Sequence, residues 1–194
     1  MKRSSYLETI KLVDGEIYNI EYHQKRYESV LDSLGVGKKE DLSKYINPPK
    51  FGIYRCRLVY THNDIDVSYH EYKKREINSL KLVFNNDIEY SQKLENRDEI
   101  NALFELREDC DDILIIKNLL ICDTSIANVA FYKDGKWFTP KEPLLKGTTR
   151  ARLIDEGKII ESDIKVQDIR SFSKVALLNA MIDFDVLQQY EILI

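Results

Sequence analysis

Two Asp-Gly dipeptides, each set between strand-like runs, constrain the fold more than any other feature of the sequence. Asp14-Gly15 separates residues 7–12 from residues 16–20, and Asp134-Gly135 lies between two later runs of β-forming residues, 129–132 and 136–139. Asp-Gly is typical of a two-residue hairpin turn, because both turn positions need a positive φ. The sequence therefore predicts one antiparallel hairpin at the start of the chain and a second one far along it.

Between the hairpins the pattern alternates strands with short helices. Residues 21–34 carry apolar side chains at helical spacing and are followed by Gly35, which predicts a helix. Strand-like runs and helix-like runs elsewhere predict further strands at 52–61, 65–72, 80–84, 113–116 and 119–122, and further helices at 96–107 and 150–156. The fold class is therefore mixed, α/β or α+β. A polar stretch near residue 76 suggests a small N-terminal α+β domain (1–76) and a larger C-terminal domain (77–194).

Composition excludes several classes of protein. The 194 residues are 43% hydrophobic and 32% charged, with a formal net charge of -4. The longest basic block is Lys73-Lys74-Arg75, so no nucleic-acid surface is expected. The uncharged apolar stretches are too short to span a bilayer, and we expect a cytoplasmic protein without membrane contact. Three cysteines without metal-ligand spacing predict reduced thiols and no metal site.

Two local features could bind an anion. Gly147-Thr148-Thr149 feeds the predicted helix at 150–156, and the free N–H groups of such a helix start bind phosphate readily. Alternatively, Thr148 or Thr149 is an N-cap. Arg26 lies beside the apolar stripe of its helix, where an arginine favours an anionic partner. The alternatives for Arg26 are a snorkelling side chain or a structural salt bridge.

Four motifs, in order, resemble those of the class IV aminotransferases. Residues 22–26 resemble the family's His-x-x-Arg, and residues 123–129 resemble its acidic-residue loop ending in Asn-Val. Residues 138–140 and 144–150 look like its Thr-Pro followed by Leu-x-Gly-x-Thr-Arg. The family includes D-amino-acid and branched-chain aminotransferases and 4-amino-4-deoxychorismate lyase. The resemblance implies their two-domain fold, with pyridoxal 5'-phosphate (PLP) held between the domains.

The resemblance also assigns roles to individual residues. Lys93 would be the catalytic Schiff-base lysine, and Asp123 would face the pyridine nitrogen. Arg26 would bind the phosphate, joined by the helix start. The cofactor-binding residues that the resemblance implies are Arg26, Lys93, Asp123, Asn128, Thr148, Thr149, Asn179 and Ala180. These roles agree with chemistry, because a lysine can bond to an aldehyde and a carboxylate can keep the ring nitrogen protonated.

The chain departs from the family pattern in two ways. It lacks about two strands that precede residues 7–9 in typical members, so the expected fold is N-terminally shortened. It also has Asp123 where most members have Glu. The missing segment bears mainly on the residues that would bind the substrate. Arg57 is the candidate for binding the substrate carboxylate. Arg55 lies on the same strand face, so the alternative is that both arginines are simply exposed on the surface.

The resemblance implies a PLP-dependent enzyme that acts on a small amino acid. Transamination between an amino acid and a 2-keto acid is the first expectation. Residues 178–181 resemble the Asn-Ala-Leu of the lyase branch, which keeps elimination with release of pyruvate open. A PLP-binding protein without turnover is the third possibility. The family also implies a homodimer.

Overall fold

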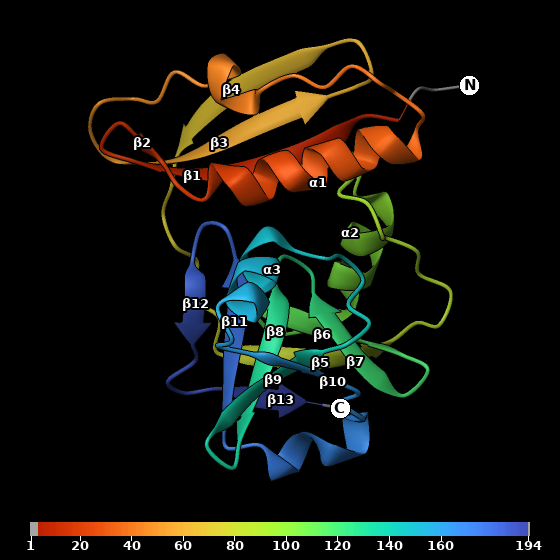
Figure 1. The fold of residues 1–194 in the computed structure, drawn as a ribbon. Coiled ribbons are helices and arrows are strands. Elements are labelled where there is room, and N and C mark those ends of the chain that lie inside the picture. Colours follow the sequence, from red (N-terminus) through yellow and green to blue (C-terminus); the bar gives the residue numbers. More distant parts are fainter. Residues whose placement is uncertain (1–3, 194) are drawn as a thin grey trace. The chain divides into compact units, whose positions relative to one another are not determined.

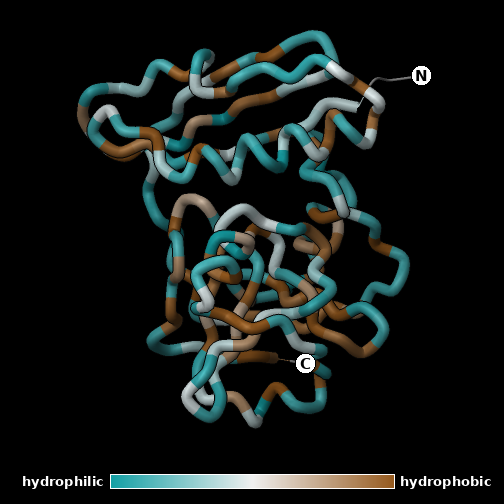
Figure 2. Tube along the Cα trace, in the orientation of Figure 1, coloured by the Kyte–Doolittle hydropathy of each residue, from teal (hydrophilic) through white to brown (hydrophobic). Residues whose placement is uncertain are grey.

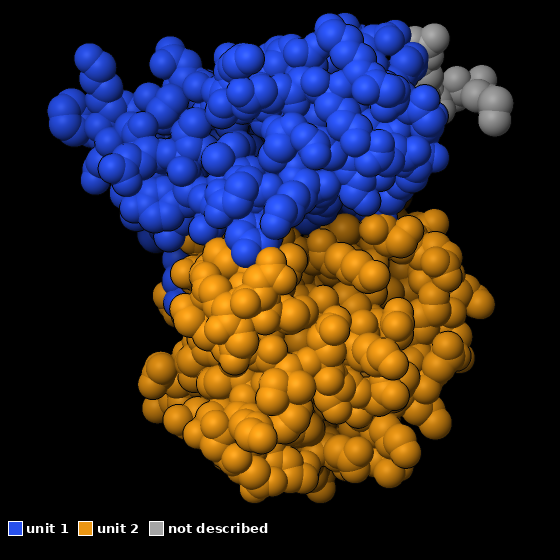
Figure 3. Space-filling view, viewed as in Figure 1, with its two compact units in different colours: residues 1–74, 92–96 blue, residues 75–91, 97–194 orange. Residues whose placement is uncertain are grey.

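The computed structural model describes residues 4–193, which form two compact units, coloured separately in Figure 3. Unit 1 ends at Lys74 but also contains Gln92–Asn96, and unit 2 contains Arg75–Ser91 and everything from Arg97 onward. The polar stretch in the sequence predicted a single boundary near residue 76. In the structure the chain leaves unit 1, returns to it for the short Gln92–Asn96 segment, and then leaves again. This return segment carries Lys93.

Unit 1 is an antiparallel sheet with the strand order β2-β1-β3-β4, and α1 runs along β1 (Figure 1). Its elements are β1 (Tyr6–Val13), β2 (Glu16–Ile17), α1 (Ile20–Ser33), η1 (Leu42–Tyr45), β3 (Ile53–Tyr60) and β4 (Ile65–Glu71). The second strand of the predicted hairpin is shorter than expected because α1 already begins at Ile20. Tyr27, Val30 and Leu31 of α1 pack into the core of unit 1. This is the face that the helical spacing predicted.

Alternation along β1 decides which side chains enter that core. Tyr6, Ile10 and Leu12 are buried and belong to the cluster beneath α1. Glu8 lies on the same strand face, because side chains two residues apart point the same way. It is 0% exposed. A carboxylate is therefore placed at a core position of unit 1.

Unit 2 contains a larger mixed sheet with the order β10-β9-β8-β7-β6-β5-β13, to which β11 and β12 are added at β8. The β5–β6, β5–β13 and β9–β10 pairs are parallel, and the other pairs of this sheet are antiparallel. Its elements are β5 (Ser79–Phe84), α2 (Asp98–Phe104), η2 (Glu105–Arg107), β6 (Asp112–Lys117), β7 (Leu120–Thr124), β8 (Asn128–Lys133), β9 (Lys136–Pro140), α3 (Thr148–Asp155), β10 (Ile160–Ser162), η3 (Val166–Ser171), β11 (Lys174–Asn179), β12 (Asp183–Val186) and β13 (Glu191–Leu193).

The central strands of unit 2 are apolar along most of their length (Figure 2). All of β6 except Lys117 is buried, as is typical of a strand covered on both faces. The predicted helix at 96–107 is shorter than expected, since α2 ends at Phe104 and continues as the 3-10 turn η2. No element was predicted after residue 157, where the structure has β10 to β13.

Both Asp-Gly hairpins are confirmed. Asp14 and Gly15 have φ values of 48° and 86°, and Asp134 and Gly135 have values of 50° and 80°. Two successive positive φ angles define the turn type whose twist matches a β-hairpin. The flanking strands pair antiparallel in both places.

Among the described residues, no helix is both long and apolar enough to cross a membrane. The same residues contain no group of His, Cys, Asp or Glu side chains arranged to hold a metal ion. Cys56, Cys110 and Cys122 are buried free thiols, as the sequence analysis expected.

Candidate cofactor site

The Lys93 segment pairs with the open edge of β1. The N–H of Leu7 donates to the carbonyl of Lys93 at 2.8 Å, and the N–H of Glu95 donates to the carbonyl of Ser5 at 2.9 Å. The main chain of Lys93 is thus fixed directly beside Leu7, the neighbour of Glu8. This contact makes Lys93 part of unit 1, although the chain enters unit 2 on both sides of it.

Glu8 binds two side chains of the His-x-x-Arg motif. His23 Nδ1 lies 2.6 Å from Glu8 Oε2, and Arg26 donates from Nε to Oε1 at 2.7 Å and from Nη2 to Oε2 at 2.5 Å. The i,i+3 spacing places His23 and Arg26 on one side of α1, over the same carboxylate. Arg26 therefore forms the salt bridge that the sequence analysis kept as an alternative. Only the side-on edge of its guanidinium is used in this pair.

The charges in this cluster are set by burial and by its ion pair. Burial alone would raise the pKa of Glu8, but the positive charge of Arg26 and the hydrogen bonds from His23 and Arg26 outweigh it and lower that pKa to about 2. Because the Glu8 carboxylate can only accept, Nδ1 of His23 must donate. Burial lowers the pKa of His23 below its usual value of 6.5, so its ring is neutral near pH 7.

Lys93 lies close enough to this cluster to influence it electrostatically. Besides burial and the charge of Arg26, the positive charge of Lys93 also lowers the pKa of His23. Unit 1 thus brings together Arg26 and Lys93, two residues that the sequence analysis selected separately. Both positive charges lower the pKa of His23.

Arg57 is engaged within unit 1. Its Nη2 donates to Glu95 Oε1 at 2.7 Å, and the Ser5 hydroxyl donates to Glu95 Oε2 at 2.6 Å. Glu95 follows Lys93 by two residues. The contacts of Arg57 therefore attach the Lys93 segment to β3, whereas the sequence analysis proposed a substrate carboxylate as its partner. Both side chains are about one-third exposed, at 33% and 37%.

In unit 2, Asp123 lies in β7 and is buried, at 5% exposure. Its Oδ1 accepts from Asn128 Nδ2 at 2.7 Å, and its Oδ2 accepts from the N–H of Leu145 at 3.0 Å. Burial raises the pKa of Asp123 to about 6, although these hydrogen bonds and the charge of Arg150 oppose the shift. A buried carboxylate of this kind favours a cationic or proton-donating partner.

Asn128 also holds the loop that precedes α3. Its Nδ2 donates to the carbonyl of Leu145 at 2.8 Å. At Gly147 an added Cβ would lie only 2.1 Å from Asn128 Oδ1, so the close approach requires glycine. Asp123, Asn128 and the entry to α3 therefore form one connected network.

The start of α3 presents backbone donors. Gly147 is the N-cap residue and makes no side-chain cap, while Thr148 and Thr149 already lie inside the helix and are buried. The N-cap alternative for these threonines is therefore wrong. The first intrahelical bond runs from Ala151 N–H to the carbonyl of Gly147 at 3.0 Å. The N–H groups before Ala151 have no partner within the helix and can bind an anion.

Asn179, at the end of β11, connects two loops of unit 2. Its Oδ1 accepts from the N–H groups of Met181 and Ile182 at 2.9 and 3.1 Å, and its Nδ2 donates to the carbonyl of Ile126 at 3.3 Å. Ala180 lies in the turn that these bonds shape. The turn is thereby fixed to the loop between Asp123 and Asn128.

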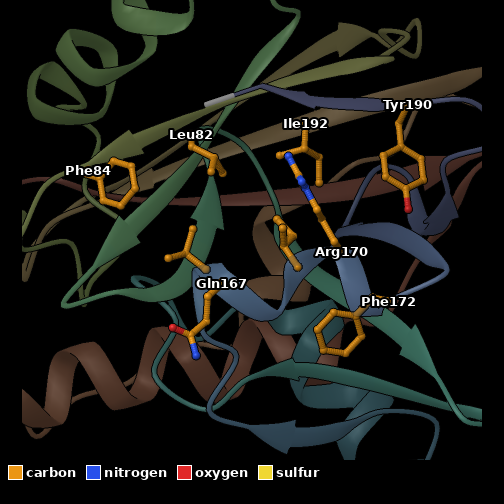
Figure 4. Close-up of a pocket in the computed structure, with 9 residues that line it drawn as sticks. Leu82, Phe84, Gln167, Arg170, Phe172, Tyr190 and Ile192 are labelled. Carbon is orange, nitrogen blue, oxygen red and sulfur yellow. The ribbon is translucent and has the colours of Figure 1, made fainter.

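A cavity of about 590 Å³ lies elsewhere in unit 2, between β5, β13 and η3. Its walls are mostly apolar, and Arg170 extends from η3 toward Ile192 of β13 (Figure 4). The predicted site residues do not line this cavity. It is therefore distinct from the two clusters described above.

Sequence reasoning missed Glu8, the N–H of Leu145 and the steric role of Gly147. Glu8 had a recognisable signal, because it occupies an inward position in a strand whose Tyr6, Ile10 and Leu12 are apolar. A charged residue at a core position needs a partner. The other two contacts join segments far apart in the sequence and had no local signal.

Comparison with known proteins identifies the family. The family described as Amino-transferase class IV matches residues 100–184. An uncharacterized protein of Haemophilus influenzae is 38% identical over 180 residues, which cover 90% of this chain and 96% of that protein. A solved structure from Haemophilus somnus 129PT, provisionally named as a 4-amino-4-deoxychorismate lyase, is 36% identical with a TM-score of 0.86. The match covers 93% of this chain and 98% of that one.

The fold is also shared with a more distant enzyme. The PLP-bound form of a hypothetical aminotransferase from Mycobacterium tuberculosis is 15% identical, has a TM-score of 0.78, and the match covers 96% of this chain and 81% of that one. This likeness concerns the fold alone. Together with the relatives above, it confirms the predicted fold class. The chain belongs to the class IV aminotransferase family, whose members are PLP-dependent aminotransferases and lyases.

Proposed function

We propose that this protein binds PLP through Lys93 and uses it to act on a small amino acid. The observation that carries the proposal is the pairing of the Lys93 segment with β1, beside the cluster of Glu8, His23 and Arg26. The family resemblance assigns the other proposed cofactor contacts to Asp123, Asn128, Thr148, Thr149, Asn179 and Ala180.

The chemistry of these residues fits PLP. Lys93 supplies an amine, Asp123 is a buried carboxylate with a raised pKa, and the first N–H groups of α3 have no partner within the helix. These groups match an aldehyde, a protonatable ring nitrogen and a phosphate, respectively. When bound, PLP supplies an electron-withdrawing ring that stabilises negative charge at the substrate α-carbon.

Each residue then has a defined task. The Lys93 amine would hold the cofactor aldehyde, and as a free amine it would take the proton from the substrate α-carbon. Asp123 would keep the ring nitrogen protonated, and Asn128 holds the Asp123 carboxylate in place. Arg26 and the first-turn N–H groups of α3 are the groups that would hold the phosphate.

For the reaction, elimination with release of pyruvate is the first candidate. The relative at 36% identity carries a provisional 4-amino-4-deoxychorismate lyase name, and Asn179 stands where the lyase branch has asparagine. Transamination, the first expectation from the sequence, stays the second candidate. It is supported by the presence of aminotransferases in the same family.

Two measurements test the proposal. Borohydride treatment of PLP-saturated protein followed by peptide mapping should place the cofactor on Lys93. A label on another lysine, or no label, would contradict the assignment.

The reaction is then resolved by a paired assay, in which 4-amino-4-deoxychorismate releases pyruvate without a keto acid if the protein is a lyase. Amino transfer that depends on an added 2-keto acid would instead identify an aminotransferase, and turnover in neither assay would indicate a binding protein.

A further inference from the structure

We propose that Glu8 is a positioning residue that orients Arg26 for the phosphate of the cofactor. The proposal rests on the proposed function, because it assigns a role to Glu8 only if Arg26 binds that phosphate. Glu8 is 0% exposed and accepts from His23 and twice from Arg26. A fully buried carboxylate with three donors holds its partners in one geometry.

In the pair of Glu8 and Arg26, only one edge of the Arg26 guanidinium is directed at the carboxylate. Nε and one N–H of Nη2 are directed at Glu8, so the plane of the group is fixed by two bonds. The other N–H groups, on Nη1 and the outer side of Nη2, form the end-on edge. The Arg26 side chain is 14% exposed, whereas the Glu8 side chain that holds it is 0% exposed. A fixed guanidinium loses less conformational entropy when it binds a phosphate.

Net charge alone predicts that Glu8 weakens the binding of the phosphate. The Glu8 carboxylate neutralises Arg26, and the neutral His23 adds no charge. If charge were the only contribution, removing the Glu8 carboxylate would strengthen the binding of a phosphate dianion. If orientation dominates, removing it weakens that binding. The sign of the effect therefore distinguishes the two roles.

The experiment compares PLP with pyridoxal, which has the same aldehyde and ring but no phosphate. Equilibrium binding of both to the apo protein gives a ratio of dissociation constants that isolates the contribution of the phosphate. In Glu8→Gln we expect this preference for PLP to fall at least tenfold, which corresponds to about 1.4 kcal/mol. Glu28→Gln, which removes one charge from the same helix as Arg26, is the matched control and should keep the preference.

A second variant covers the case in which Glu8→Gln does not fold. Arg26→Lys keeps the positive charge but cannot form the side-on pair of bonds, and it should lose the preference to a similar extent. A preference that is unchanged or increased in Glu8→Gln, or retained in Arg26→Lys, would overturn the positioning role. Failure of the parent protein to bind either compound would instead overturn the proposed function. The two failures are thus distinguishable.

Discussion

Asn128 Oδ1 occupies the space in which a side chain at Gly147 would begin, since a Cβ there would lie 2.1 Å away. Gly147→Ala must therefore displace the Asn128 amide from Asp123 and from Leu145. We expect a loss of about 1–3 kcal/mol in the free energy of unfolding, as for other overpacked sites. Gly37→Ala, where no heavy atom lies within 4 Å, is the control. Denaturant unfolding of both variants measures the difference, and equal stabilities would show that Asn128 can move freely.

The raised pKa of Asp123 predicts a pH-dependent stability of the protein without cofactor. Its pKa rises from 3.8 to about 6, mainly through burial. The protonated form therefore stabilises the fold fully below pH 3.8, and this stabilisation is lost as the pH rises through 6. The amount is on the order of 3 kcal/mol. Asp123→Asn should lack this decrease between pH 4 and pH 7 in denaturant unfolding. Parallel curves for the two proteins would contradict the assignment.

Arg57 should stabilise the Lys93 segment through Glu95. A partly exposed ion pair contributes about 0.2–1 kcal/mol. Arg57→Gln should therefore speed exchange of the Glu95 amide, whose N–H donates to Ser5, by up to about fivefold in hydrogen-exchange measurements. Arg55→Gln, on the same strand face, is the control. If Arg57→Gln left exchange unchanged and raised only the KM for substrate, the substrate-carboxylate role from the sequence analysis would be favoured instead.

We expect a homodimer in solution. The class IV family places its cofactor near a two-fold interface, and a chain of 194 residues exposes a large share of its surface when alone. Sedimentation equilibrium of the PLP-saturated protein should give twice the mass of the chain, which is 22.8 kDa. A monomer with full cofactor occupancy would contradict this prediction.

The sequence by itself determined the features that depend on neighbouring residues. Asp-Gly fixed both hairpin turns because the two turn positions need positive φ angles, and the apolar spacing between Tyr27 and Leu31 marked the buried face of α1. The resemblance to the family selected Arg26, Asp123 and Lys93 as candidates, because motif order and spacing are properties of the chain alone.

Only the tertiary structure decided how these residues are held. Nothing near Lys93 in the sequence indicates that its main chain pairs with Leu7, because a strand edge accepts any extended segment that the fold brings to it. The partner of Arg26 likewise comes from β1, and the partner of Asp123 from the loop before α3. The ion pair with Arg26 then lowered the pKa of Glu8 against the effect of burial, and burial raised the pKa of Asp123. These values depend on desolvation and on contacts between distant segments, which a local pattern does not contain.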